Sequence, residues 1–204
     1  MPQVPGMDVP PQEGVVLVGV VSDTHGQVHP RVKEALTSVD HIVHAGDIGG
    51  ADVLAQLRAI APVTAVRGNC DLGAWAADLP ERAEVELGGA HIVVAHLPMR
   101  LKREVQAESV AVVVSGHSHV PSLEAVDGVL YLNPGSAGPR RLGRPRTVAR
   151  IEISPAHEPG LPKAGGPPQA GPSGAAVSWV AVSRVAVSRI AGPLVTAYIL
   201  AVDD

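Results

Sequence analysis

Two histidines separated by a single residue, His117 and His119, follow directly after an apolar run of the chain. One histidine in such a place is most often packed or hydrogen-bonded, whereas two so close together indicate a shared ligand. Asp23 and His25 repeat the spacing after the first apolar run. Imidazole and carboxylate groups are common protein ligands of divalent transition metals. The two pairs therefore predict a metal site, provided that the fold brings them together.

Polar residues of the same chemical kind stand after five of the apolar stretches, including the two already described. A single Asp-x-His or Gly-Asp is more often a turn, so only their recurrence is informative. In an open α/β sheet the carboxyl ends of the strands form the edge at which ligands bind. The segments concerned are residues 22–26, 44–47 and 67–71, His96, and residues 115–119.

The elements that would position these residues follow from the apolar pattern. Strands are predicted over residues 15–21, 41–45 and 63–66, and helices over residues 30–39 and 51–60. This alternation is typical of two βαβ units with a parallel sheet.

The middle of the chain predicts hairpins instead. Short apolar stretches at residues 83–87 and 91–95 flank Gly88-Gly89, and those at 123–126 and 129–132 flank Asp127-Gly128, which is a strong turn signal. Two further strands are predicted over residues 110–114 and 147–153, with a helix over residues 101–108. A parallel half followed by a hairpin-rich half indicates two sheets packed face to face, with helices outside.

Composition limits the classes of protein to which the chain can belong. Its 204 residues are 46% apolar, include no Phe and carry a formal net charge of −4 without a basic block, so no strong nucleic-acid footprint is expected. The single cysteine, Cys70, excludes an intrachain disulfide and favours a reducing compartment. The apolar runs are too short to span a bilayer. We therefore expect a cytoplasmic protein that does not bind membranes.

Three regions are predicted along the chain. Residues 1–14 form a flexible N-terminal tail, residues 15–154 a single domain, and residues 155–204 a Pro/Gly-rich linker with a C-terminal extension. Within the extension the pentapeptide Val-Ala-Val-Ser-Arg occurs twice, at residues 180–184 and 185–189. An added strand pair, an oligomer contact and an adventitious extension all remain open for it.

The ordered motifs resemble those of the calcineurin-like metallophosphoesterases, and in particular the small YfcE-type phosphodiesterase branch. They are Asp23-x-His25, Gly46-Asp47, Gly68-Asn69-Cys70-Asp71, His96, Gly116-His117-Ser118-His119 and Asn133-Pro134-Gly135-Ser136. The resemblance covers about residues 15–153. It implies an α/β fold, namely a four-layer αββα sandwich of two mixed β-sheets flanked by helices.

The resemblance also implies a binuclear metal centre. One metal would be held by Asp23, His25 and His119, the other by Asn69, His96 and His117, and Asp47 would bridge both. Such mixed ligands suit Mn²⁺, which we expect first, or Ni²⁺, Fe or Zn²⁺, better than Mg²⁺ or Ca²⁺. The implied activity is hydrolysis of a small phosphodiester, a nucleotide among the candidates, by a metal-bridging hydroxide.

Two motifs depart from the pattern of the wider family. Cys70 stands where many larger members have a histidine that helps to protonate the leaving group, although the small branch often has cysteine there. Together with Asp47 and Asn69, Cys70 and Asp71 are therefore candidate catalytic residues, and metal-bound water is a further candidate acid. His96 is followed by Leu97-Pro98 in place of the usual glycine, so the neighbouring loop is expected to differ.

Other readings of the same residues stay open. Arg67, Arg140 and Arg141 could contact a phosphate or be solvated, and Trp75 could stack on a base or pack as part of a lid. A phosphomonoesterase or nuclease could use the same centre. A catalytically silent interaction scaffold, such as the retromer subunit of this fold, and a homo-oligomer are further alternatives.

Overall fold

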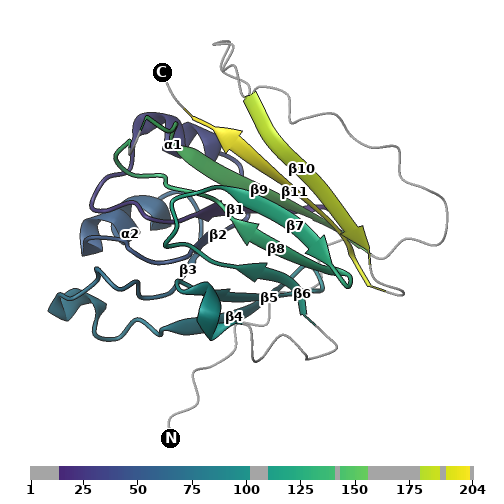
Figure 1. Ribbon diagram of the computed structural model, residues 1–204, viewed down its shortest axis with the longest axis horizontal. Coiled ribbons are helices and arrows are strands. Elements are labelled where there is room, and N and C mark those ends of the chain that lie inside the picture. Colours follow the sequence, from purple (N-terminus) through teal and green to yellow (C-terminus); the bar gives the residue numbers. More distant parts are fainter. Residues whose placement is uncertain (1–13, 102–109, 141–142, 156–179, 189–191, 203–204) are drawn as a thin grey trace, which may run out of the picture.

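Two mixed β-sheets pack face to face in the computed structural model, which describes residues 14–101, 110–140, 143–155, 180–188 and 192–202 (Figure 1). The six-stranded sheet has the order β10 (Val180–Ser188), β11 (Leu194–Ala201), β9 (Thr147–Ser154), β1 (Val16–Val21), β2 (His41–His44) and β3 (Val63–Ala65). The five-stranded sheet has the order β4 (Arg82–Leu87), β5 (Ala90–Ala95), β6 (Val110–Val114), β8 (Val129–Asn133) and β7 (Ser122–Val126).

Strand directions agree with the sequence pattern. β1, β2 and β3 are parallel neighbours, as are β5, β6 and β8. The two predicted hairpins are β4–β5 and β7–β8. At the turn between β7 and β8, both Asp127 and Gly128 have a positive φ, which is the geometry that an Asp-Gly pair favours in a tight hairpin.

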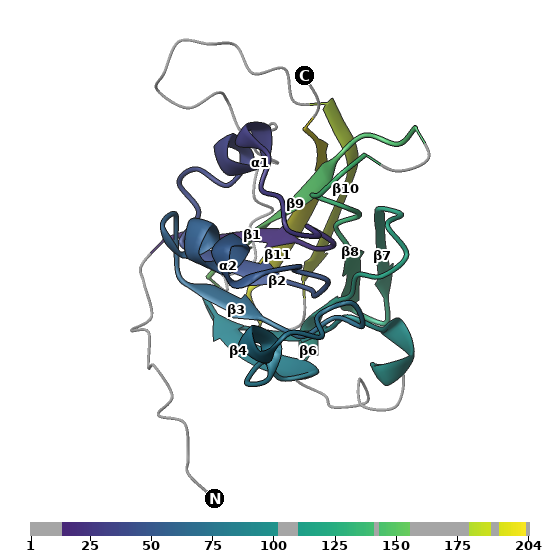
Figure 2. The same cartoon turned by 90° about the vertical axis from the view of Figure 1, so that its left-hand side faces the viewer.

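Helices cover the outer face of the six-stranded sheet. The helices α1 (Pro30–Ala35) and α2 (Ala51–Arg58) lie together on that side (Figure 2). Val53, Leu54 and Leu57 of α2 are buried, as the helical spacing of these apolar residues requires. A side chain at Gly19 of β1 would collide with Leu36, so glycine permits the close approach of α1 to the sheet.

The inner face of the six-stranded sheet packs against the five-stranded sheet. Two short 3-10 helices, η1 (Ala74–Ala76) and η2 (Pro98–Arg100), lie in the connections of the middle region. Leu101, directly after η2, packs with Val93 and Val113 in a small separate cluster. The rest of the helix predicted over residues 101–108 lies outside the described residues. The predicted sandwich of two mixed sheets is confirmed.

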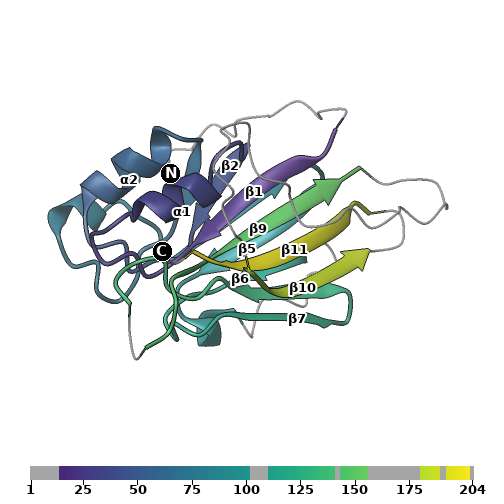
Figure 3. The same cartoon turned by 90° about the horizontal axis from the view of Figure 1, so that it is seen from above.

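The C-terminal extension contributes two strands to the larger sheet. β11 pairs with β9 on one side and with β10 on the other, and Figure 3 shows the three side by side with β7 of the other sheet next to β10. β11 is buried on both faces: Val195 and Ile199 belong to the core between the sheets, and Leu200 belongs to the core under the helices. The described part of the repeat, residues 180–188, lies in the single strand β10, which forms an added strand pair with β11.

In the part of the chain that the structure describes, no helix is long and apolar enough to cross a membrane.

Candidate metal centre

The carboxyl ends of strands from both sheets meet at one edge of the sandwich, and the candidate ligands lie there. Asp23 and His25 follow β1, Asp47 follows β2, Asn69 follows β3, His96 follows β5, and His117 and His119 follow β6. The structure thus brings together all seven residues that the motifs single out. The approach of the loops depends on small residues, because a side chain at Gly68 would collide with the backbone of Asp47.

Four of these residues form one compact group. The metal-binding atoms of Asp23, His25, Asp47 and His119 all lie within 4.8 Å of one another. His119 Nε2 is 3.0 Å from Asp23 Oδ1 and 3.4 Å from His25 Nε2. Both carboxylates are buried. Donor atoms so close together, of two kinds that transition metals accept, fit a cation between them.

An unsatisfied oxygen supports this fit. Asp23 Oδ1 is buried, and no described residue donates a hydrogen bond to it, although His119 Nε2 lies 3.0 Å away. A buried polar atom without a hydrogen bond is destabilising, so native structures seldom contain one. A metal ion at this position would coordinate the oxygen and remove the penalty.

The remaining three residues form a second group beside the first. Asn69 Oδ1 lies 3.0 Å from His96 Nε2 and 3.0 Å from His117 Nδ1. Asp47 stands between the groups: its Oδ1 is 3.4 Å from His96 Nε2, and its Oδ2 is 4.0 Å from His25 Nε2. Each oxygen of one carboxylate therefore faces a different group.

The backbone at the centre is held in an uncommon conformation. Seven described residues other than glycine have a positive φ, and five of them are Asp23 (55°), His25 (45°), Asp47 (52°), His117 (69°) and His119 (57°). Each such residue is disfavoured by roughly 1–2 kcal/mol. Strain of this kind persists where the surrounding structure enforces it, and it concentrates at functional sites.

Hydrogen bonds prepare Asp47 to remain charged. Burial alone would raise its pKa, but the neighbouring His96 and a hydrogen bond from the backbone N–H of Cys70 (2.8 Å) hold the pKa well below its ordinary value of 3.8. The ionised carboxylate is the form that binds a cation.

A carbonyl orients the ring of His96. Its Nδ1 lies 2.7 Å from the carbonyl oxygen of Ala45 and can only donate to it, so Nε2 is the atom that faces Asn69 and Asp47. Metal-binding histidines commonly have such a partner on their second nitrogen. The other buried carboxylate of the centre, Asp23, differs from Asp47. Burial has the largest influence on its pKa and raises that pKa above its ordinary value.

The side chain of Asp71 is turned toward the backbone of two neighbouring loops. Its carboxylate is buried and accepts hydrogen bonds from the backbone N–H groups of Gly68 (2.8 Å), Ile48 (3.1 Å) and Gly49 (2.9 Å). Both oxygens are thus engaged in joining the loops after β2 and β3. These bonds connect the loops that also carry Asp47 and Asn69.

Cys70 contributes its backbone to the centre, since its N–H donates to Asp47 Oδ1. The thiol is exposed and lies 3.4 Å from Asn69 Nδ2. Leu97 and Pro98, which replace the glycine usual in the family, begin the 3-10 helix η2. The carbonyl of His96 nevertheless accepts a hydrogen bond from Gly116 N–H at 3.1 Å.

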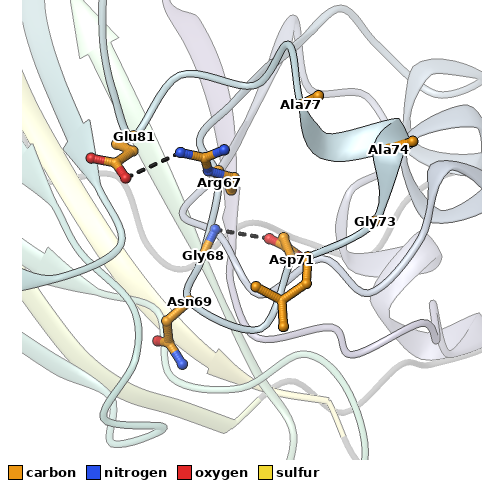
Figure 4. A pocket seen from close by; sticks show the side chains of 9 residues that line it. Arg67, Gly68, Asn69, Asp71, Gly73, Ala74, Ala77 and Glu81 are labelled. Atoms are coloured by element: carbon orange, nitrogen blue, oxygen red, sulfur yellow. Dashed lines mark hydrogen bonds and ion pairs between the residues drawn. The ribbon is translucent and has the colours of Figure 1, made fainter.

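A pocket of about 460 Å³ opens beside Asn69. Figure 4 shows Arg67, Asp71 and Glu81 around it, with an ion pair of 3.1 Å between Arg67 Nη2 and Glu81 Oε1. Trp75 does not line this pocket but packs against the core under the helices. Of the other candidate arginines, Arg140 is exposed and Arg141 lies outside the described residues.

Two residues near the centre, Asn133 and His44, are of the same chemical types as the ligands. The sequence alone therefore does not show that they support the ligand loops. Asn133 donates to the carbonyl of Gly116 (2.8 Å) and to Ser118 Oγ (3.1 Å), and so braces the loop of His117 and His119. His44 is fully buried at the end of β2 and contacts Thr24 in the loop after β1 and Gly46 in the loop after β2. Their hydrogen bonds in the structure show that they support these loops.

Titration of His44 predicts a pH dependence of stability. Burial lowers the pKa of His44 from 6.5 to about 3. Its contribution to stability is complete above pH 6.5 and is lost as the pH falls toward 3, because the unfolded chain then binds a proton that the folded chain excludes. From pH 7 to pH 5, the free energy of unfolding of the metal-free protein should fall by about 2 kcal/mol more in the wild type than in His44→Gln.

Urea unfolding in EDTA at the two pH values measures this difference. An equal loss in both proteins would show that His44 is not held neutral by the fold.

Comparisons with known proteins agree with the geometry. A sequence model of the calcineurin-like phosphoesterase superfamily domain matches residues 16–155. A probable metallophosphoesterase of Methanocaldococcus jannaschii is 34% identical to the chain over 136 residues, which are 60% of this chain and 69% of that protein. A phosphodiesterase of the same organism is 28% identical over 137 residues, which are 58% of this chain and 82% of that protein.

Solved structures share the fold. The crystal structure of a conserved protein of Streptococcus pneumoniae, described as a predicted phosphoesterase, has 32% identity and a TM-score of 0.56, and covers 69% of this chain and 84% of its own. The structure of vacuolar protein sorting 29 from Cryptosporidium parvum has 18% identity and a TM-score of 0.61, and covers 92% of this chain and 98% of its own. This second likeness concerns the fold alone.

Proposed function

The chain belongs to the calcineurin-like phosphoesterase superfamily, and from this premise we propose that it is a binuclear-metal-dependent phosphodiesterase acting on small phosphodiesters. The observation that carries the proposal is the pair of donor groups joined by Asp47, one of whose oxygens faces each group. The similarity to a phosphodiesterase of M. jannaschii supports a diester substrate.

Each side chain has a definite part in this proposal. Asp23, His25 and His119 would hold one metal, Asn69, His96 and His117 the other, and Asp47 both. When bound, the two metals would supply an activated water at neutral pH and stabilise charge on the entering and leaving oxygens. The carboxylate, amide and imidazole donors suit Mn²⁺ best, with Ni²⁺, Fe or Zn²⁺ as alternatives.

The pocket beside Asn69 is the place for one of the two ester groups. Arg67 lines it together with small residues, so that a group as large as a nucleoside has room there. Both oxygens of Asp71 accept hydrogen bonds from the backbone, so in this proposal Asp71 is not the group that protonates the leaving oxygen. Aryl esters, whose leaving oxygens need little protonation, are therefore the substrates of choice for a first test.

Hydrolysis of bis-p-nitrophenyl phosphate by the full-length protein tests the function. We expect turnover that requires Mn²⁺, stops with EDTA and returns when Mn²⁺ is added in excess. The monoester p-nitrophenyl phosphate should be cleaved more slowly. Faster cleavage of the monoester would indicate a phosphomonoesterase, and cleavage of long DNA or RNA a nuclease.

A protein with no measurable affinity for Mn²⁺ and no turnover would instead favour the interaction scaffold. The fold is compatible with such a role, but a scaffold has no need of a complete set of metal-binding side chains at its sheet edge.

A further inference from the structure

His44 is a buried histidine whose ring touches two of the loops that carry the proposed ligands. It is the last residue of β2 and is fully buried. Its Nε2 lies 2.9 Å from Thr24 Oγ1, and its Nδ1 accepts from the backbone N–H of Gly46 at 3.2 Å. Thr24 stands between Asp23 and His25, and Gly46 stands directly before Asp47. The ring thus connects three of the proposed ligands without contacting a metal position itself.

The hydrogen-bond network admits one proton arrangement. A backbone N–H can only donate, so Nδ1 of His44 must carry the lone pair and Nε2 the proton. Nε2 therefore donates to Thr24 Oγ1, which is free to accept because its own proton goes to the carbonyl of Ile48 at 2.9 Å. Every polar atom in this chain of contacts is satisfied by a neutral imidazole.

The two loops that His44 joins need such support. Asp23, His25 and Asp47 have a positive φ, and so has Gly46 (90°). Backbone in this region relaxes when its contacts are removed, because other conformations are lower in energy for residues with a side chain. Backbone bonds hold the loops together too, from Asp23 N–H to the carbonyl of Gly46 and from His25 N–H to that of Asp47, both 3.0 Å. The side chain of His44 adds two further hydrogen bonds between these loops, to Thr24 and to Gly46.

We propose that His44 is a positioning residue of the metal centre, whose neutral ring fixes the Asp23–His25 loop against Asp47. The proposal rests on the proposed function only in that the centre binds metal, and it is tested by metal affinity, not by turnover. Partners hydrogen-bonded to metal ligands typically contribute about 10- to 100-fold to metal affinity. His44 bonds to residues next to the ligands, and we expect an effect of the same order.

Substitutions can remove the two bonds of His44 separately. His44→Asn keeps an acceptor near Nδ1 for Gly46 and loses the donor, whereas His44→Gln keeps a donor near Nε2 for Thr24 and loses the acceptor. Thr24→Val removes the hydroxyl from the other side, and Thr24→Ser restores it. If a His44 variant fails to fold, the Thr24 pair still tests the contact.

The same strand offers a matched control. His41, at the other end of β2, bonds through Nε2 to Thr64 Oγ1 at 2.8 Å, so it has the same kind of partner but does not touch the ligand loops. His41→Gln should lower the melting temperature without changing metal affinity.

Calorimetric titration of the metal-free full-length proteins with Mn²⁺ gives the readout. Thr24→Val and His44→Asn should each weaken binding by about 10- to 100-fold. The double variant should be no weaker than the single variants, and Thr24→Ser should bind like the wild type.

The proposal is overturned if Thr24→Val and the folded His44 variants bind Mn²⁺ within about 2-fold of the wild type, or if His41→Gln loses as much affinity. A wild type that binds Mn²⁺ normally but hydrolyses no phosphoester would refute the proposed function alone. A wild type that binds no metal would refute both.

Discussion

Asp47→Asn is expected to remove both metals and to lower the hydrolysis of bis-p-nitrophenyl phosphate by about 10³-fold or more, since the metals would stabilise the transition state by several kcal/mol. Asp47 is the residue whose two oxygens face different donor groups, 3.4 Å from His96 Nε2 and 4.0 Å from His25 Nε2. An amide removes the negative charge and offers N–H protons toward a cation. Loss at both positions follows because neither group keeps its shared carboxylate.

The measurement combines kcat/KM at high Mn²⁺ with the metal content of the purified protein. Asp78→Asn is the matched control, because Asp78 is an exposed aspartate in the loop after η1 and is not one of the proposed ligands. It should keep full activity and two metals per chain. An Asp47→Asn protein that retains one tightly bound metal would show that the carboxylate serves a single site and does not bridge.

The position of the centre could be predicted from the sequence because its signals are local. Each ligand motif directly follows an apolar run, and the carboxyl ends of such runs must gather at one edge once the strands pair. The two hairpins could also be predicted from the sequence, because Gly88-Gly89 and Asp127-Gly128 favour tight turns in any fold.

What the sequence could not reveal depends on side-chain direction. Asp71 lies in the same motif as Asn69, and nothing in the residue types shows that its oxygens turn to the backbone of Gly49 and Gly68. His44 likewise stands three residues before Asp47, as a ligand could, yet its ring points to Thr24. Such distinctions arise from contacts between distant loops, which spacing does not encode.

The pairing of β11 with β9 could not be predicted from the sequence for a related reason. Residues 194–201 form an apolar run that fits a buried strand or a buried helix equally well. Its neighbour β9 ends at Ser154, so 39 residues separate the two strands in the sequence (194 − 154 − 1). Strand pairing over such a distance is decided by the free edge that the rest of the sheet leaves, and here that edge belongs to β9.

Truncation after Ser154 is therefore expected to unfold the protein, although the matched family domain ends at residue 155. The deletion removes β11, whose Val195, Tyr198, Ile199 and Leu200 are at most 2% exposed. Burial of each such side chain contributes about 1.5–3 kcal/mol. Their sum is comparable to the whole stability of a domain, about 5–15 kcal/mol. The truncation also leaves β9 as an unpaired edge, which favours aggregation.

A pair of leucines separates this effect from a general sensitivity to substitution. Leu200→Ala in the full chain should lower the free energy of unfolding by about 2–5 kcal/mol, because Leu200 is 2% exposed in the core under the helices. Leu72→Ala should change it by less than about 0.5 kcal/mol, because Leu72 is 88% exposed. Urea unfolding monitored by circular dichroism measures both.

The extension also reaches the metal centre through a short chain of contacts. Val202 N–H donates to the carbonyl of Arg146 at 2.9 Å, and Arg146 Nε donates to the carbonyl of Gly138 at 3.0 Å. Gly138 packs so closely on the backbone of Asp23 and Thr24 that a side chain there would collide with both. Loss of β11 should therefore reduce metal affinity even under conditions that keep the fragment folded. A soluble fragment of residues 1–154 that binds Mn²⁺ like the full chain would contradict this coupling, and would show that β9 and the helices hold the Asp23 loop without the C-terminal strands.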